Sequence, residues 1–181
     1  MQSRAVFLDL NGTLVMPIKV ETPKQYAPIP GALEAVAILN RSGFLCPVVT
    51  MQSRIAKGLY SEADFRGWFD AFSHQAAAVG AFFAGLYLCP HRFHSGCHCG
   101  KPKPGLYDQA VSDLDIDRSQ SYVVGDSIED MKAAQRLNIP CGLVLTGRGS
   151  VTAETLSWPL DHIGSDLYTV AEWIAARPRR P

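Results

Sequence analysis

Apolar runs of strand length, separated by helical patterns, most constrain how this chain can fold. Each run is continuous rather than alternating with polar residues. A strand of this kind is buried on both faces, which is typical of a parallel sheet covered by helices on both sides. The expected strands are residues 5–8, 44–49, 86–88, 122–124 and 141–145.

Helical patterns follow these runs in turn. Ser61 and Asp64 form a capping-box-like start for the second pattern, and Pro104 suits the first turn of the third. The alternation predicts one α/β domain over residues 1–181, a doubly wound Rossmann-like parallel sheet with right-handed crossovers. The expected helices are residues 31–40, 61–79, 104–114, 128–137 and 167–176.

Composition excludes several classes of partner. Of the 181 residues, 47% are hydrophobic and 19% are charged, and the formal net charge is zero, so no overall field favours nucleic acid or anionic lipid. No apolar run approaches the length of a signal peptide or a membrane span. We therefore expect a cytoplasmic protein, monomeric or weakly dimeric, that binds a small molecule. Cys46 and Cys141 lie in apolar runs and are expected in the core.

Polar residues stand at the ends of three expected strands: Asp9, Thr50 and Asp126. Ligands of a doubly wound sheet bind at the carboxyl ends of its strands, so these side chains are expected to converge. Two facing carboxylates favour a divalent cation between them, and Mg²⁺ suits such a site beside a phosphate. Lys101 supplies a cation for a transferring phosphoryl group. Each residue alone has an ordinary structural explanation, but together they indicate phosphoryl transfer.

Residues 15–30 form the longest irregular segment and contain four prolines. We expect this segment to lie over the site at the strand ends.

Soft metal ligands gather in the stretch "CPHRFHSGCHCGKP". A tetrahedral Zn²⁺ can be bound by this pattern, in which Cys-x-His is followed after five residues by Cys-x-Cys. A site with four protein ligands has no open position for water, so it would be structural rather than hydrolytic. The alternative is a reduced loop without metal. The expected ligands are Cys89, His91, Cys97 and Cys99, with His94 or His98 as alternatives to His91.

Four stretches together resemble the motifs of haloacid-dehalogenase-superfamily phosphatases: "FLDLNGTL", "VVTMQSRIAKGLYSEADF", "CPHRFHSGCHCGKPKPG" and "YVVGDSIEDM". The resemblance extends over residues 5–147 and is greatest to the zinc-containing branch of D,D-heptose 1,7-bisphosphate phosphatases and histidinol-phosphatases. It implies a Rossmann-type domain with little or no cap, Mg²⁺ as cofactor and a structural Zn²⁺ at the four ligands named above.

By position, the resemblance implies that Asp9 is a nucleophile that forms an aspartyl-phosphate. It also implies that Thr50 and Lys101 bind the transferring phosphoryl group. The implied Mg²⁺ ligands are Asp9, the backbone carbonyl of Asn11 and Asp126, with Asp130 in support.

The stretch "QSRIAKG" is similar to the corresponding loop of the heptose phosphatases, which favours a sugar phosphate over histidinol phosphate. It implies that Gln52, Arg54 and Lys57 bind the substrate. The chain also departs from its relatives here, since Met51 stands where they have Asn and Gly100 where they have Arg. These departures remove two polar groups, whereas Arg54 adds a positive charge where relatives have Gly.

Asn11 stands where the resemblance places the acid that protonates the leaving group and later activates water. An amide transfers no proton near neutral pH, and general acid–base catalysis contributes about 10²–10⁴-fold. Four explanations fit: an engineered Asp→Asn change, a leaving group that needs no acid, a phosphosugar-binding protein with weak turnover, or deamidation before Gly12 that regenerates some aspartate.

The sequence thus predicts a slowed, Mg²⁺-dependent phosphatase acting on a small phosphorylated metabolite. The favoured substrate is a sugar phosphate such as D-glycero-D-manno-heptose 1,7-bisphosphate. A histidinol-phosphatase-like enzyme and a catalytically weak phosphosugar-binding protein are the alternatives.

Overall fold

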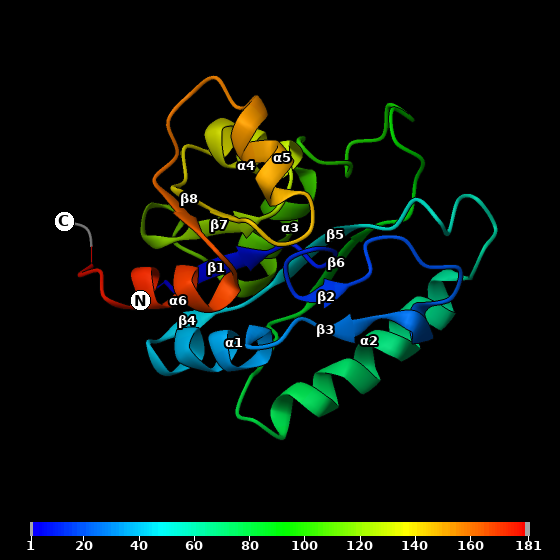
Figure 1. Cartoon of the computed structure of the whole chain (residues 1–181), viewed down its shortest axis with the longest axis horizontal. Helices are drawn as coiled ribbons and strands as arrows, with labels where there is room; N and C mark the ends of the chain where they lie inside the picture. The colour runs from blue at the N-terminus through cyan, green and yellow to red at the C-terminus, as the bar shows by residue number, and fades with distance from the viewer. Residues whose placement is uncertain (1, 180–181) are drawn as a thin grey trace.

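A sheet of seven strands runs through the centre of the protein (Figure 1). The structure is a computed structural model and describes residues 2–179. The strands are β1 (Arg4–Leu8), β4 (Phe44–Leu45), β5 (Val48–Met51), β6 (Leu86–Cys89), β7 (Tyr122–Gly125), β8 (Cys141–Val144) and β9 (His162–Gly164). Their order is β6-β5-β1-β7-β8-β9, and β4 also pairs with β1. Every pairing in this sheet is parallel, as the continuous apolar runs predict.

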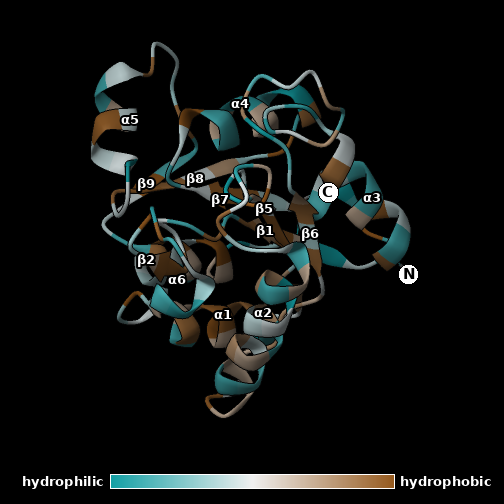
Figure 2. Cartoon of the chain, turned by 90° about the vertical axis from the view of Figure 1, so that its right-hand side faces the viewer, coloured by the Kyte–Doolittle hydropathy of each residue, from teal (hydrophilic) through white to brown (hydrophobic). Residues whose placement is uncertain are grey.

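Helices cover both faces of the sheet and give three layers (Figure 1). One face carries α1 (Ala32–Arg41), α2 (Glu62–Ala77) and α6 (Leu167–Ala175), and the other carries α3 (Gly105–Leu114), α4 (Ile128–Leu137) and α5 (Gly149–Thr155). Two groups of buried apolar side chains fill the spaces between the layers. Figure 2 shows hydrophobic residues concentrated in the central strands. Within residues 2–179, no helix is long and apolar enough to cross a bilayer.

The expected strands and helices are confirmed to within a few residues, with one interruption. The run expected over residues 44–49 forms two strands, β4 and β5, because Pro47 has no N–H to donate to a neighbouring strand. Ser61 and Asp64 form the capping box at the start of α2. Cys46 and Cys141 are 0% and 7% exposed, as expected of core residues.

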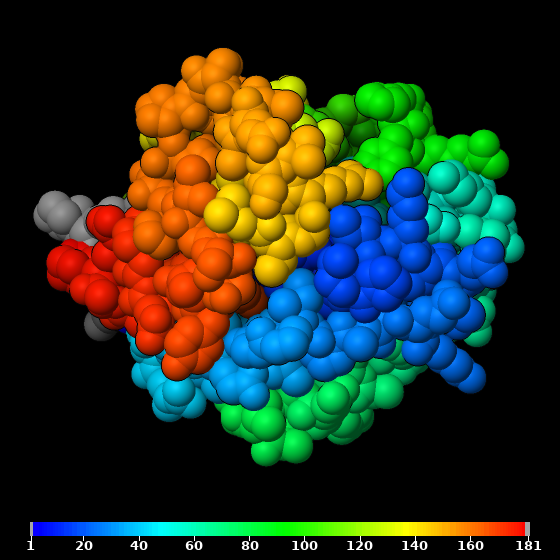
Figure 3. Space-filling view, in the orientation of Figure 1, coloured from blue at the N-terminus to red at the C-terminus, as the bar shows by residue number. Residues whose placement is uncertain are grey.

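Several short elements were not expected. Residues 15–30 contain an antiparallel pair, β2 (Val15–Met16) and β3 (Ala27–Pro28), with the 3₁₀ turn η1 (Pro23–Gln25) between its strands. A second 3₁₀ turn, η2 (Arg118–Gln120), precedes β7. Such short segments, like α5 and β9, are too brief to show a clear hydrophobic period. In Figure 3 the blue segment after β1 lies on the surface beside the yellow-orange chain that begins α5.

The topology brings the ends of β1 and β7 together. The chain passes from β1 to β5 and β6 on one side, and then returns to place β7 against the other side of β1. Leu8 and Val124 are register partners near the carboxyl ends of these strands. Ligand sites of doubly wound sheets lie at such a reversal of strand order.

Candidate active site

The carboxylates of three aspartates meet at this edge of the sheet. Asp9 follows β1, and its backbone N–H donates to the carbonyl oxygen of Val124 at 2.9 Å, which fixes it beside β7. Asp126 follows β7, and Asp130 lies in the first turn of α4. One carboxylate oxygen from each aspartate lies within 4.8 Å of those of the other two. The expected convergence of Asp9 and Asp126 is therefore observed.

Lys101 lies between two of these carboxylates. Its Nζ donates to Asp9 Oδ1 at 2.5 Å, to Asp130 Oδ1 at 2.6 Å and to the backbone oxygen of Val49 at 2.9 Å. Burial by itself lowers the pKa of Lys101, but the charges of Asp130 and Asp9 outweigh burial and hold that pKa well above its usual value. Lys101 is therefore a buried cation at the site.

The negative charge of the cluster is only partly compensated. Burial raises the pKa of Asp126 to about 8, and the charges of Asp9 and Asp130 add to the increase. Burial also raises the pKa of Asp9 to about 6, although Lys101 opposes this effect. Three carboxylates share one lysine, so a cation would offset the excess negative charge.

Two glycines make room for the Asp126 carboxylate. A Cβ atom on Gly12 would lie 2.1 Å from Asp126 Oδ2, and one on Gly147 would lie 2.2 Å from the same oxygen. The backbone N–H of Arg148 donates to Asp126 Oδ2 at 2.7 Å, and Thr152 Oγ1 donates to the Asp126 carbonyl oxygen at 2.8 Å. The segment after β8 therefore holds Asp126 in place.

The oxygen atoms that remain fit a hard divalent cation. Asp130 Oδ1 and Oδ2 accept hydrogen bonds from neighbouring side chains, and Asp126 Oδ2 accepts one from a backbone N–H. Within the described part of the chain, Asp126 Oδ1 and Asp9 Oδ2 make no side-chain hydrogen bond. Two carboxylate oxygens that accept no side-chain hydrogen bond, in a negatively charged cluster whose metal-binding atoms are oxygens, suit Mg²⁺ better than a metal that prefers sulfur or nitrogen.

Asn11 is held by buried side chains centred on Gln52, which is 2% exposed. Gln52 Nε2 donates to Asn11 Oδ1 at 2.6 Å and to Thr50 Oγ1 at 2.9 Å. Gln52 Oε1 accepts from the hydroxyls of Tyr60 at 2.9 Å and Tyr26 at 3.4 Å. Protein groups therefore use both donors and both lone pairs of the Gln52 amide. Thr50 is fully buried, and its hydroxyl already serves this network.

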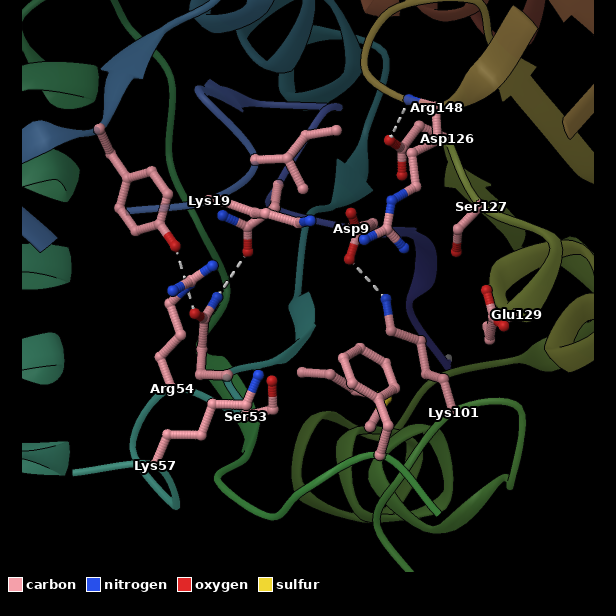
Figure 4. Close-up of a pocket in the computed structure, with 16 residues that line it drawn as sticks. Asp9, Lys19, Ser53, Arg54, Lys57, Lys101, Asp126, Ser127, Glu129 and Arg148 are labelled. Atoms are coloured by element: carbon pink, nitrogen blue, oxygen red, sulfur yellow. Dashed lines mark hydrogen bonds and ion pairs between the residues drawn. The ribbon is translucent and has the colours of Figure 1, made fainter. Parts of the chain in front are cut away.

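A pocket opens over these groups (Figure 4). In Figure 4, Arg54, Ser53 and Lys57 lie on one side, and Lys101 and Asp126 lie on the other. The residues expected at the site that line the pocket are Asp9, Asn11, Gln52, Arg54, Lys57, Lys101 and Asp126.

Sequence reasoning missed several lining residues, above all Lys19, Glu129 and Arg148. Figure 4 shows the Arg148 guanidinium reaching toward Asp9. Arg148 comes shortly after β8, so applying the strand-end rule to that strand would have found it. Lys19 lies in residues 15–30, which confirms that this segment borders the site, but no local pattern distinguishes it from a surface lysine.

The four expected zinc ligands form a compact cluster. Cys89 Sγ lies 3.7 Å from Cys97 Sγ and 3.2 Å from Cys99 Sγ, and His91 Nδ1 lies 3.2 Å from Cys99 Sγ. For comparison, the sulfur atoms around a tetrahedral Zn²⁺ with 2.3 Å Zn–S bonds lie about 3.8 Å apart, close to the separations in this cluster. A hydrogen bond from Ser95 is the main cause that lowers the pKa of Cys97 to about 6, whereas burial raises the pKa of Cys89 to about 12 and also raises that of Cys99. Of the three thiols, Cys97 is therefore the one that most readily forms the thiolate that binds metal.

The other loop histidines, His94 and His98, lie outside this cluster, so His91 is the histidine that belongs to it. The loop also brings Gly100 against its neighbours: a Cβ there would lie 3.2 Å from Cys97 Sγ and 3.4 Å from Met51 Cε. The two departures at positions 51 and 100 therefore lie beside each other, so that a side chain at position 100 would touch Met51.

Comparison with known proteins identifies close relatives. The family described as HAD-hydrolase-like matches residues 98–170. The D-glycero-beta-D-manno-heptose-1,7-bisphosphate 7-phosphatase of Haemophilus ducreyi is 36% identical over 85% of this chain and 89% of its own length. The protein of that name from Vibrio cholerae is 39% identical over 82% of this chain and 84% of its own length.

Two solved structures of similar proteins lead to the same family. The D,D-heptose 1,7-bisphosphate phosphatase of B. bronchiseptica, complexed with magnesium and phosphate, superposes with a TM-score of 0.88 and 30% identity over 94% of this chain and 97% of that one. The enzyme of that name from Burkholderia thailandensis gives a TM-score of 0.76 at 28% identity, over 97% of this chain and 100% of that one.

Proposed function

The chain belongs to the HAD-like phosphatase family that includes the D-glycero-beta-D-manno-heptose-1,7-bisphosphate 7-phosphatases, and from this premise we propose its reaction. It releases phosphate from a sugar phosphate such as D-glycero-D-manno-heptose 1,7-bisphosphate, as a single-domain cytoplasmic enzyme. The observation that supports this most is the buried arrangement of Asp9, Lys101 and Asp126 beneath a pocket with basic side chains.

Asp9 is the proposed nucleophile. A carboxylate oxygen of Asp9 attacks phosphorus, the bond from phosphorus to the sugar oxygen breaks, and water then hydrolyses the aspartyl-phosphate. Lys101 holds the Asp9 carboxylate at 2.5 Å and offsets the charge of the transferring group. Arg54 and Lys57, on the pocket wall, are placed to bind the rest of an anionic substrate.

Two metals complete the proposal. Asp9, Asp126 and the backbone carbonyl of Asn11 would hold Mg²⁺, with Asp130 in support, and the ion would neutralise phosphoryl charge. Cys89, His91, Cys97 and Cys99 would hold a structural Zn²⁺.

Asn11 weakens acid–base catalysis in this proposal. Its side chain lines the pocket but transfers no proton to the leaving group. Deamidation is disfavoured in the folded protein, because the Gly12 nitrogen that would attack the Asn11 side chain donates its hydrogen to the Val15 carbonyl oxygen at 2.8 Å.

The test measures phosphate release from heptose 1,7-bisphosphate with Mg²⁺, beside histidinol phosphate. We expect Asn11→Asp to raise the rate about 10²-fold or more and Asp9→Asn to abolish turnover. The control is Asp70→Asn, a change of the same kind at an exposed position on α2. If both the unchanged chain and Asn11→Asp are inactive on the heptose substrate, the substrate is wrong; faster release from histidinol phosphate would favour the histidinol-phosphatase alternative.

A phosphosugar-binding protein is the second candidate, and the observation that favours it is an amide in place of a carboxylate at Asn11. Such a protein would bind the phosphosugar saturably in Mg²⁺ and release no phosphate over hours. Turnover that depends on Asp9 would rule this candidate out.

A further inference from the structure

The side chain of Arg148 enters the pocket from the segment after β8. Arg148 is exposed and lines the same pocket as Asp9 and Asp126. Within residues 2–179 its guanidinium makes no hydrogen bond or ion pair, although two carboxylates line that pocket. Figure 4 shows this guanidinium reaching toward Asp9. Its five N–H donors are therefore free for a bound molecule.

The backbone that carries Arg148 is fixed against the ends of β1 and β7. Thr146 Oγ1 donates to the Gly12 carbonyl oxygen at 2.6 Å, and the Arg148 N–H donates to Asp126 Oδ2 at 2.7 Å. Between these two bonds the chain passes so close that a Cβ on Gly147 would lie 2.6 Å from Gly12 Cα. The Arg148 side chain therefore starts from a fixed point beside the site, although it is itself exposed.

Lys101 cannot by itself hold a phosphate group. Its Nζ has three hydrogens, and these already go to Asp9, Asp130 and a backbone oxygen. Lys101 and one Mg²⁺ would together balance the three carboxylates of the cluster, whereas a phosphate ester brings about two further negative charges. A guanidinium supplies positive charge and also two parallel N–H donors that match phosphate oxygens.

We propose that Arg148 is a further catalytic residue, which binds the phosphoryl group undergoing transfer through two of its N–H donors. This inference rests on the proposed function. Lys101 supplies charge from the buried side of the site, and Arg148 supplies free donors from the exposed side. Arg54 and Lys57 lie across the pocket in Figure 4 and remain for the rest of the substrate.

The transfer balances with Arg148 charged throughout. An Asp9 oxygen bonds to phosphorus while the bond from phosphorus to the sugar oxygen breaks. The sugar oxygen takes the electron pair and then a proton from water, since a guanidinium does not give up its own. The Arg148 N–H groups hold two non-bridging oxygens and offset the repulsion between the phosphate ester and the attacking carboxylate. Removing one positioned donor typically lowers kcat by about 10²–10³-fold.

Binding of orthovanadate, measured by calorimetry in saturating Mg²⁺, tests this role directly, because vanadate takes the geometry of a transferring phosphoryl group. We expect Arg148→Ala to weaken binding about 10²-fold. Arg148→Lys should weaken it less, since lysine keeps the charge but loses the paired donors. The backbone N–H that binds Asp126 is present in both variants, so the segment keeps its anchor. Arg41→Ala, at an exposed position at the end of α1, is the matched control.

Phosphate release distinguishes the transferring phosphoryl group from a second phosphate of the substrate. The relatives are named 7-phosphatases, so the substrates are heptose 1,7-bisphosphate and heptose 7-phosphate, each assayed in the unchanged and Asn11→Asp chains. Arg148→Ala should lower kcat on both substrates by the same factor, about 10²–10³-fold. Guanidinium ions added below denaturing concentrations should restore part of the lost rate, a rescue that a merely structural residue does not show.

Failure of this inference and failure of the proposed function give different results. Unchanged vanadate affinity in Arg148→Ala, or no vanadate binding by the unchanged chain, overturns the inference. A rise in KM for the bisphosphate alone also overturns it, because Arg148 would then bind the second phosphate. If neither the unchanged chain nor Asn11→Asp releases phosphate from either substrate, the proposed function is wrong, and vanadate binding that depends on Arg148 would still support the phosphoryl-binding role. Thermal unfolding midpoints establish that each variant is folded.

Discussion

At the scale of single residues, burial sets the chemistry of the aspartates. Asp126 is 2% exposed and lies between two glycines, so water solvates its charge poorly and its pKa rises to about 8. The same burial that makes the carboxylate hold a proton also makes it a strong site for a cation. Metal and proton therefore compete for the same oxygen atoms.

We predict that Mg²⁺ binds more tightly at pH 8 than at pH 6 and releases protons as it binds. The pKa values of Asp9 and Asp126 are about 6 and about 8, so at the lower pH the metal-free protein holds protons that Mg²⁺ must displace. Calorimetric titration in two buffers of different ionisation enthalpy measures both the affinity for Mg²⁺ and the number of protons released. Equal affinity at the two pH values would contradict the prediction.

The stability of the metal-free protein should depend on pH in the opposite direction to its affinity for Mg²⁺. Both folded-state pKa values lie above the ordinary value of 3.8, so the folded, metal-free protein holds protons that the unfolded chain has lost. Its free energy of unfolding should therefore fall as pH rises from about 4 to about 8. Asp126→Asn should reduce that fall and also weaken Mg²⁺ binding.

At the scale of elements, the loop of residues 90–104 joins β6 to α3, carries three of the four candidate zinc ligands and places Lys101 in the candidate site. Residues 90–104 contain no helix or strand, and the loop supplies few buried apolar side chains. If the four ligands hold zinc as proposed, the metal would add to the order that the Lys103 hydrogen bonds to Gly96 and Cys97 already give this loop. Lys101 lies two residues after Cys99, so the Cys/His cluster and the buried lysine of the candidate site share one short segment.

We predict that Cys97→Ser removes bound zinc, lowers the thermal unfolding midpoint and reduces phosphate release, because Lys101 loses its fixed position. Metal analysis, thermal unfolding and the phosphate assay measure these three effects. Cys141→Ser, outside the loop, serves as the control that keeps zinc. Unchanged zinc content in Cys97→Ser would contradict the assignment of the ligands.

At the scale of the whole molecule, the candidate site and the apolar layer between α1, α6 and the sheet lie in different regions. The proposed catalytic side chains lie at the carboxyl edge of the sheet, whereas α1 and α6 pack together against one of its faces. Ile174 of α6 is fully buried in the apolar layer on that face.

We predict that Ile174→Ala lowers the free energy of unfolding by about 2–5 kcal/mol while leaving kcat within a factor of a few at temperatures where the protein is folded. Urea unfolding and the phosphate assay measure the two quantities. A large loss of kcat in the folded variant would show that α6 packing is coupled to the site.

Local sequence determined the elements and the outline of the site. A buried parallel strand needs a continuous apolar run, and a helix needs its own period and caps, so both can be recognised within a short window. Strand-end residues such as Asp9 and Asp126 follow from the same windows once the sheet is known to be parallel. The spacing from Cys89 to Cys99 likewise predicted the cluster of four candidate metal ligands.

Tertiary structure alone decided how these groups act on one another. Lys101 meets Asp9 across 92 positions of sequence, and Gln52 meets Asn11 across 41. The fit of Asp126 against Gly147 depends on where the segment after β8 crosses the end of β1. Contacts of this kind depend on how separate elements pack, which no local period records. The sequence by itself therefore determined which strand-end residues gather at the sheet edge, and the fold determined which other side chains join them, which lysine stays charged and which way the Asn11 amide faces.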